Sequence, residues 1–140
     1  MTGLCLEDLS VGQRAESSHV VTAADIEAFA AVSGDNNPLH LDEAYAATTR
    51  FGGRIAHGML SASYVSALIA TELPGPGAIY LSQSLKFHRP VRIGDTVTTR
   101  VQITAIDEAD ARVTLATRCL VDGKIALSGD ALVLAPRRGG

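Results

Sequence analysis

The sequence lacks three features that mark particular classes of protein: a cysteine framework, an excess of basic residues and a long uninterrupted hydrophobic run. Cys5 and Cys119 are too few for a set of disulfides and do not have the spacing of metal-binding cysteines, so we expect two reduced thiols in a cytoplasmic protein. A net charge of −3 leaves no basic surface for nucleic acid. An anionic ligand would therefore need a local cluster of positive side chains.

The sequence also shows no targeting or membrane-spanning segment. Its most apolar stretch, residues 55–73, is interrupted by His57, several hydroxyl side chains and Glu72, which makes it too polar for a bilayer span. The acidic start MTGLCLEDLSVG differs from the basic, then apolar, pattern of a signal peptide. We expect no membrane partner and a single domain over residues 1–140.

The first half of the chain alternates between strand and helix signals. A strand is expected over residues 13–21, and a helix between a Thr22 N-cap and Gly34. A short helix should follow, capped by Asp42 and stopped by the glycine pair 52–53.

The second half contains one apolar helix and then only strands. The segment HGMLSASYVSALIATELPG has apolar or small residues on every face, which predicts a helix surrounded by protein. Four strand-like runs follow, and Asp122-Gly123 between the last two is a strong hairpin signal. Because no helices separate these runs, we expect an α+β fold in which an antiparallel meander curls around the helix. The four runs cover residues 77–91, 95–107, 111–123 and 124–136.

The loop SGDNNPLHLD, residues 33–42, carries more functional groups than a connection between helices needs. Asp35 and Asn37 are common turn residues, and Pro38 forces the residue before it out of helical conformation. Turn formation alone explains this composition. The alternative is acid–base chemistry, in which Asp35 and His40 hold one water molecule between them. Spacing does not decide between the two.

The stretch RIAHGML places His57 and Gly58 at the start of the apolar helix. The first N–H groups of a helix have no internal partner and lie at the positive end of its dipole, and a glycine there permits close approach of a carbonyl group. This is a natural oxyanion site. A tight start to the helix, with His57 as a hydrogen-bonded neighbour, explains the same residues.

Two blocks, SGDNNPLHLDEAYAATTRFGGRIAHGML and LPGPGAIYLSQSLKFHRPVRIGD, together resemble the MaoC-like (R)-specific enoyl-CoA hydratases, over about residues 22–133. The resemblance implies a hot-dog fold, in which an antiparallel sheet wraps one long central helix. It also implies that Asp35 and His40 are the catalytic pair and that Asn37 supports the loop. The Gly58 N–H would bind the thioester oxygen, and Ser66 would orient the pair.

The implied reaction is the reversible syn hydration of a trans-2-enoyl-CoA to an (R)-3-hydroxyacyl-CoA, in β-oxidation or the supply of polyhydroxyalkanoate precursors. It needs no metal and no redox cofactor, and CoA is part of the substrate. The resemblance further implies a homodimer, which we expect to form through the edge strand within GAIYLSQSLKF.

Two other classes of function remain to be weighed. Hot-dog thioesterases and acyl-carrier-protein dehydratases commonly carry a catalytic carboxylate on the central helix, but residues 59–71 contain none and Glu72 lies beyond them. An acyl-CoA-binding module would not need both Asp35 and His40. The sequence leaves open which cations meet the CoA phosphates and whether Leu68 and Ile69 border the acyl pocket. The candidate cations are Lys86, His88, Arg89 and Arg92.

Overall fold

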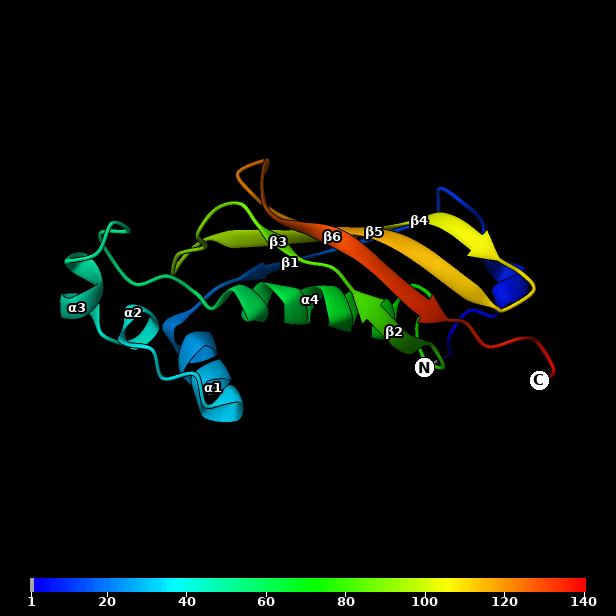
Figure 1. Ribbon diagram of the computed structural model, residues 1–140, viewed down its shortest axis with the longest axis horizontal. Coiled ribbons are helices and arrows are strands. Elements are labelled where there is room, and N and C mark those ends of the chain that lie inside the picture. Colours follow the sequence, from blue (N-terminus) through cyan, green and yellow to red (C-terminus); the bar gives the residue numbers. More distant parts are fainter. Residues whose placement is uncertain (1) are drawn as a thin grey trace.

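The computed structural model describes residues 2–140, and in it a six-stranded antiparallel sheet lies along one side of the helix α4 (Figure 1). The short helices α1, α2 and α3 gather beyond the N-terminal end of α4, and both chain termini lie near its other end. The elements in chain order are η1 (Leu6–Asp8), β1 (Arg14–Val20), α1 (Ala23–Ser33), α2 (Pro38–Leu41), α3 (Glu43–Ala47), α4 (Gly58–Thr71), β2 (Ile79–Gln83), β3 (Lys86–Phe87), β4 (Thr96–Asp107), β5 (Arg112–Val121) and β6 (Lys124–Leu134).

The strands lie in the order β1-β4-β5-β6-β2, and β3 also pairs with β6. The predicted meander is correct for β4, β5 and β6, which follow one another both in the chain and in the sheet. It is wrong for the run 77–91, which divides into β2 and β3 and pairs with β6 instead of β4. The sheet therefore has β1 at one edge and β2 with β3 at the other.

The crossover that produces this order is the segment 88–95, which connects β3 to β4. It runs beside the residues that precede α4: the Ala56 N–H donates to the Val91 carbonyl at 2.7 Å, and Ile55 pairs with Arg92 in an isolated bridge. An alternating pattern indicates which side chains face the core but not which strand is the neighbour. For this reason the sequence pattern predicted that the run 77–91 lies next to β4, whereas it pairs with β6.

Local turn chemistry agrees with the sequence. Asp122 and Gly123 both have positive φ, 51° and 75°, as a two-residue hairpin between β5 and β6 requires. In the middle of β6, a Cβ at Gly129 would lie 1.8 Å from the Ser84 carbonyl oxygen. The absence of a side chain at Gly129 therefore lets the irregular link between β2 and β3 pack against β6.

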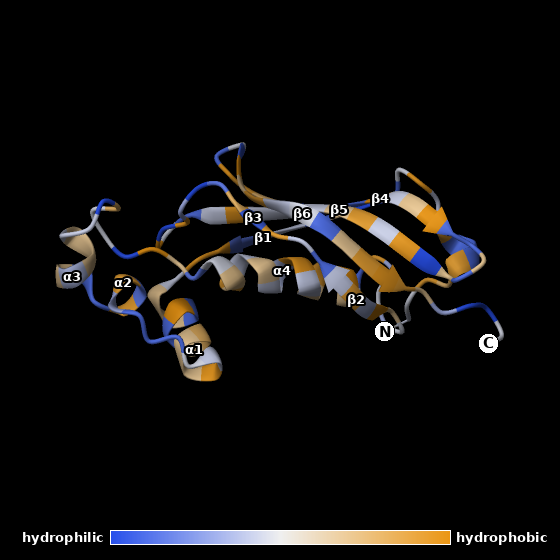
Figure 2. Cartoon of the chain, viewed as in Figure 1, coloured by the Kyte–Doolittle hydropathy of each residue, from blue (hydrophilic) through white to orange (hydrophobic). Residues whose placement is uncertain are grey.

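The core lies between α4 and the facing side of the sheet. Alternate residues of β4 and β5 point into it, which produces the bands of different hydropathy along these strands in Figure 2. Helix α4 contacts β1, β4, β5 and β6, so the predicted sheet-on-helix arrangement is confirmed. The buried side chains of β4 and β5 include Val97, Thr99, Val101, Ile103, Val113, Leu115, Thr117 and Cys119.

Helix α4 itself is buried on one face only. Leu60, Val65 and Leu68 belong to the core, whereas Met59 is 53% exposed and the small residues at 63, 67 and 70 are exposed as well. The prediction that protein surrounds this helix is therefore wrong for a single copy of the chain. Of the helices in residues 2–140, none is long and apolar enough to cross a membrane.

Helix α1 begins and ends where the sequence predicts. The Thr22 side chain accepts a hydrogen bond from the Asp25 N–H, and the Asp25 carboxylate accepts one from the Thr22 N–H, which makes a complete capping box. The Thr22 N–H, and after it the His19 side chain, lowers the pKa of Asp25. At the other end, Gly34 is left-handed with φ 80° and sends the chain toward the loop 33–42.

Candidate active site

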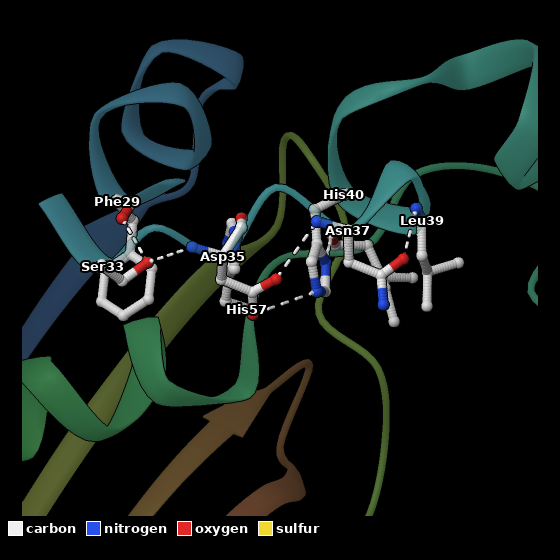
Figure 3. A network of polar contacts seen from close by, with 8 residues as sticks. Phe29, Ser33, Asp35, Asn37, Leu39, His40 and His57 are labelled. Carbon is white, nitrogen blue, oxygen red and sulfur yellow. Dashed lines mark hydrogen bonds and ion pairs between the residues drawn. The ribbon is translucent and has the colours of Figure 1, made fainter. Parts of the chain in front are cut away.

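The loop after α1 is built from short side-chain-to-backbone hydrogen bonds (Figure 3). The Ser33 hydroxyl donates to the Phe29 carbonyl at 2.7 Å and accepts from the Asp35 N–H at 3.1 Å. Asp35 Oδ1 in turn accepts from the Asn37 N–H at 3.2 Å. These bonds hold the backbone of Asp35 and one oxygen of its carboxylate, and they leave Oδ2 free to face a partner.

Asn37 and Pro38 start the four-residue helix α2, which the sequence pattern did not predict because one helical turn has no measurable period. Asn37 is its N-cap and accepts the Leu39 N–H at 3.0 Å, and Pro38 occupies the first helical position. Asn37 thus lies in the loop, between Asp35 and His40, and shapes both turns around it. Helix α2 carries His40 into a buried position.

His40 is oriented by two backbone contacts. Its Nδ1–H donates to the Ile55 carbonyl at 2.8 Å, and since a carbonyl only accepts, Nε2 carries the lone pair in the neutral ring. The His40 carbonyl accepts from Arg54 Nε at 2.7 Å. His40 Nε2 lies 4.0 Å from Asp35 Oδ2, too far for a direct hydrogen bond and suited to a bridging water. The structure thus brings the two predicted residues together.

His57 is the residue that sequence reasoning did not identify as functional. It is only 2% exposed, its ring stacks on that of His40 with centroids 3.9 Å apart, and its Nε2–H donates to the Asp35 carbonyl at 3.1 Å (Figure 3). The signal available was a histidine at the start of an otherwise apolar helix. The pattern could not show that this histidine contacts a loop more than twenty residues earlier.

A cavity of about 450 Å³ opens beside these histidines. His40, His57 and Gly58 form one side of it. Its buried wall is apolar, and its exposed rim contains arginine, histidine and aromatic side chains. The buried wall includes Ile55, Ala56, Val91, Ala126 and Leu127, and the rim includes Arg50, Met59, Phe87, His88 and Arg89.

Gly58 is the first residue of α4, directly after the N-cap His57, so its N–H lies among those with no partner inside the helix. A larger residue would clash here, because a Cβ at this position would lie 2.6 Å from Cε1 of Phe87. Its φ is outside the positive range that favours glycine. Gly58 thus lines the cavity in close contact with the Phe87 ring, at a position where a larger residue would clash.

Several predicted residues lie elsewhere. Ser66 is eight residues beyond Gly58 on α4, about 12 Å along the helix axis, and is not among the residues that line the cavity. Its orienting role remains a prediction from the resemblance. Leu68 and Ile69 pack in the core and do not line the cavity. Of the four candidate cations, His88 and Arg89 lie on the rim, but Lys86 and Arg92 do not.

Asp35, His40 and His57 each offer a possible metal-ligand atom, and these atoms lie within 4.8 Å of one another. Their geometry does not suit a shared ion. The two imidazole planes are inclined by only 27° and the rings are stacked 3.9 Å apart, so the in-plane lone pairs lie in two separate, nearly parallel planes and do not meet at one point between the rings. In addition, one nitrogen of each ring is already bonded to a backbone carbonyl.

Cys119 lies below the cavity in the core. Its thiol contacts the Ser61 carbonyl and the Thr99 hydroxyl, both at 3.6 Å, and burial raises its pKa. A buried thiol held in its protonated form is a poor nucleophile. This argues against covalent thiol chemistry at Cys119.

Comparison with known proteins shows which families this chain resembles. The MaoC like domain matches residues 9–124. An (R)-specific enoyl-CoA hydratase of Rhodospirillum rubrum is 52% identical over 133 residues, which cover 95% of this chain and 92% of that protein. A mitochondrial 3-hydroxyacyl-[acyl-carrier-protein] dehydratase of Arabidopsis thaliana is 37% identical over 91% of this chain and 78% of its own length.

Among solved structures, the (R)-hydratase of Aeromonas caviae, described as involved in PHA biosynthesis, superposes with a TM-score of 0.91 at 50% identity, over 93% of this chain and 99% of the other. The hot-dog fold implied by the sequence is thereby confirmed. With the domain match extending over most of its length, the chain belongs to the MaoC-like dehydratase family.

Proposed function

We propose that this protein is an (R)-specific enoyl-CoA hydratase, which adds water reversibly and syn across the double bond of a trans-2-enoyl-CoA. The observation that carries the proposal is the 4.0 Å separation of Asp35 Oδ2 and His40 Nε2, at the place where His40 and Gly58 line the cavity. That separation accommodates one water that bonds both groups. Close relatives that bear this activity support it.

In the proposed reaction the pair handles both protons. Asp35 and His40 remove one proton from the bound water as its oxygen attacks C3, and a proton is delivered to C2 from the same face, so the water adds syn. We assign the acid and base roles to the pair as a whole and not to either residue alone. His40 contributes Nε2 because Nδ1 is held by the Ile55 carbonyl.

As the water attacks, negative charge develops on the thioester oxygen, and the Gly58 N–H at the start of α4 would receive it. The helix dipole adds positive potential at the same point. In this arrangement the pair and the oxyanion donor flank the substrate from two different parts of the chain, the loop 33–42 and helix α4.

The rim of the cavity supports CoA as the carrier. Arg50, His88 and Arg89 lie on it, and no Asp or Glu is among the described residues that line the cavity, although the whole chain has a net charge of −3. A positive rim on an acidic protein suits the phosphates of CoA. The apolar wall beyond it suits the acyl chain.

The 37% identical acyl-carrier-protein dehydratase makes carrier-bound thioesters the second candidate substrate. Assays with crotonyl-CoA, crotonyl-pantetheine and crotonyl-acyl carrier protein distinguish the two. We expect crotonyl-CoA to be the best substrate by kcat/KM, with loss of enoyl absorbance and formation of (R)-3-hydroxybutyryl-CoA. Faster turnover of the carrier-protein thioester, or an (S) product, would contradict the proposal.

The role of the rim is tested by Arg50→Gln and Arg89→Gln. Each should raise KM for crotonyl-CoA about tenfold, which corresponds to the loss of about one charge-assisted hydrogen bond. KM for crotonyl-pantetheine should stay unchanged. Lys86→Gln is the matched control, because Lys86 lies outside the cavity. An equal loss with both thioesters would mean that the arginines act on the fold and not on the phosphates.

The proposed reaction requires no metal and no redox cofactor, because the pair supplies the proton transfers. The nearly parallel imidazole rings of His40 and His57 support this. Hydratase activity should therefore survive dialysis against EDTA. Loss of activity that zinc restores would replace the acid–base proposal with a metal-bound water.

We also propose a homodimer formed at the β2 edge. Ile79 is 58% exposed and Leu81 41% on this edge, and Met59 at the start of α4 is exposed as well. The opposite edge, β1, exposes mainly polar residues. Apolar edges are normally covered or paired. Sedimentation at micromolar concentration should give a dimer, and Leu81→Asp a monomer; a monomeric unmodified protein would contradict this.

A reducing compartment, the cytoplasm, fits the two free cysteines, of which Cys119 is buried. Among known relatives, the Aeromonas caviae hydratase suggests the supply of polyhydroxyalkanoate precursors, and β-oxidation is the process that provides trans-2-enoyl-CoA. Either role uses the same reaction at the same site.

A further inference from the structure

We propose that His57 is a positioning residue, whose Nε2–H fixes the Asp35 backbone so that the Asp35 carboxylate stays at water-bridging distance from His40. The inference rests on the proposed hydratase function but concerns a residue outside the Asp35–His40 pair. His57 joins the two halves of the site: it donates to Asp35 in the loop and directly precedes Gly58 on α4.

The hydrogen bond determines the tautomer of His57. Its partner is the Asp35 carbonyl, which can only accept, so Nε2 must carry the proton. The other nitrogen, Nδ1, is buried and has no hydrogen-bond partner within residues 2–140. The neutral Nε2–H form therefore leaves an unpaired acceptor, whereas the other tautomer would leave both the carbonyl and Nδ1–H unsatisfied.

The unpaired Nδ1 argues that His57 is more than a packing residue. Its ring lies between Phe29, at 4.9 Å between centroids, and His40, at 3.9 Å. A phenylalanine would fill such an aromatic slot without burying an unsatisfied nitrogen. What phenylalanine cannot supply is the donor to Asp35. Histidine therefore differs from phenylalanine at this position by the hydrogen bond that Nε2–H donates to the Asp35 carbonyl.

The position of that bond explains its importance for the reaction. The Asp35 side chain is about half exposed, and its backbone is held by the Ser33 hydroxyl on one side and the His57 ring on the other. Loss of the His57 donor frees the Asp35 carbonyl and lets the carboxylate move relative to His40. Misplacement of a catalytic group by about 1 Å can cost about 100-fold in rate.

Two substitutions separate the donor from the ring. His57→Gln keeps an N–H at about the position of Nε2 and loses the aromatic ring, whereas His57→Phe keeps the ring and loses the donor. We expect His57→Phe to lower kcat about 10–100-fold with KM within about threefold. His57→Gln should retain clearly more kcat than His57→Phe, and His19→Gln, on the exposed β1 strand, is the control for histidine removal.

A spectroscopic readout tests the inference without activity. Long-range ¹H–¹⁵N correlation spectra of the unmodified protein should show Nε2–H for His57 and Nδ1–H for His40. In His57→Phe the His40 tautomer should persist, because the Ile55 carbonyl still holds it. Because the spectrum of the unmodified protein reports the His57 tautomer directly, it tests the inference even if a variant does not fold.

The inference is overturned if His57 carries its proton on Nδ1, or if His57→Phe is as active as His57→Gln. These outcomes differ from failure of the proposed function. An unmodified protein that cannot hydrate crotonyl-CoA would refute the hydratase assignment, while the tautomer of His57 would still report on its bond to Asp35.

Discussion

In the sheet and α4 the buried side chains are almost all hydrocarbon, whereas in the segment 33–58 successive turns are closed by single side chains that bond backbone groups. The first region gains stability in proportion to apolar area, with little dependence on any one atom. The second depends on individual donors and acceptors, each with one partner.

This difference separates two kinds of failure. Shortening a core side chain removes contacts and leaves a cavity, which lowers stability while the folded fraction keeps its geometry. Removing one polar atom from the loop changes little area but displaces a group that performs chemistry. The two regions should therefore respond in opposite ways in stability and activity measurements.

The largest effect is expected at the pair itself. Asp35→Asn and His40→Gln should each lower kcat by about 10²–10⁴-fold, because each removes a proton acceptor or donor. Both should leave the melting temperature within a few degrees of the unmodified protein. The double variant should be little slower than either single one, since groups that act as a unit are not additive.

Enoyl-CoA hydration assays and thermal melts on the same preparations check this prediction. If either single variant keeps more than about a tenth of kcat, that residue does not belong to the acid–base pair. A large drop in melting temperature would place the loop within the stabilising core and remove the contrast between the regions.

The next effect concerns the N–H of Gly58. Gly58→Pro deletes this donor at a helix position that tolerates proline, and loss of one oxyanion donor typically costs about 10²–10³ in kcat. The variant also brings new atoms toward Phe87. A folded Gly58→Pro protein with near-normal kcat would locate the oxyanion donor elsewhere.

Gly58→Ala alone is a poor control, because its Cβ would lie 2.6 Å from the Phe87 ring. The matched comparison uses Phe87→Leu as the background, with Gly58→Ala and Gly58→Pro added separately. In that background Gly58→Ala should keep most of kcat and Gly58→Pro should still lose it. Equal losses would indicate crowding and not the missing N–H.

A core substitution should show the opposite behaviour. Leu115 is fully buried on β5, and Leu115→Ala should lower the free energy of unfolding by about 2–5 kcal/mol. The kcat of the folded protein should stay within about twofold at a temperature well below the melting point. Denaturant unfolding and active-site-normalised assays measure the two quantities. A loss of kcat much larger than twofold would mean that the core also tunes the site.

The smallest effect is electrostatic and lies at the start of α1. Because the pKa of Asp25 is lowered from 3.8, its charged form stabilises the fold above that pH, and this stabilisation disappears as pH falls through the lower folded-state value. Asp25→Asn should cost about 0.3–1 kcal/mol at pH 7. The melting temperatures of the two proteins should begin to approach each other as the pH falls below about 4; a gap that stays constant at lower pH would assign the effect to packing.

The comparison also explains which features could be predicted. Thr22, Gly34 and the Asp122-Gly123 turn act on residues next to them in the chain, so their caps and hairpin were read correctly. The pairing of β2 with β6 depends on a crossover that no local pattern encodes. Ser66 was assigned to the site by resemblance alone, and that assignment stays a prediction because Ser66 lies on α4 outside the lining of the cavity.

The order of strand and helix signals and the apolar composition of α4 were enough to indicate an antiparallel sheet packed on a helix, because caps, turns and apolar periodicity act over a few residues. The assignment of Asp35 and His40 as a catalytic pair came from the resemblance of the loop 33–42 to a known family and not from their spacing. Tertiary structure alone decided that His57 contacts Asp35 and His40, that the Phe87 ring packs close to Gly58, and that one face of α4 is left exposed. These contacts join residues far apart in the chain. They depend on how the elements pack, and packing is a property of the whole set of side chains and not of any short stretch.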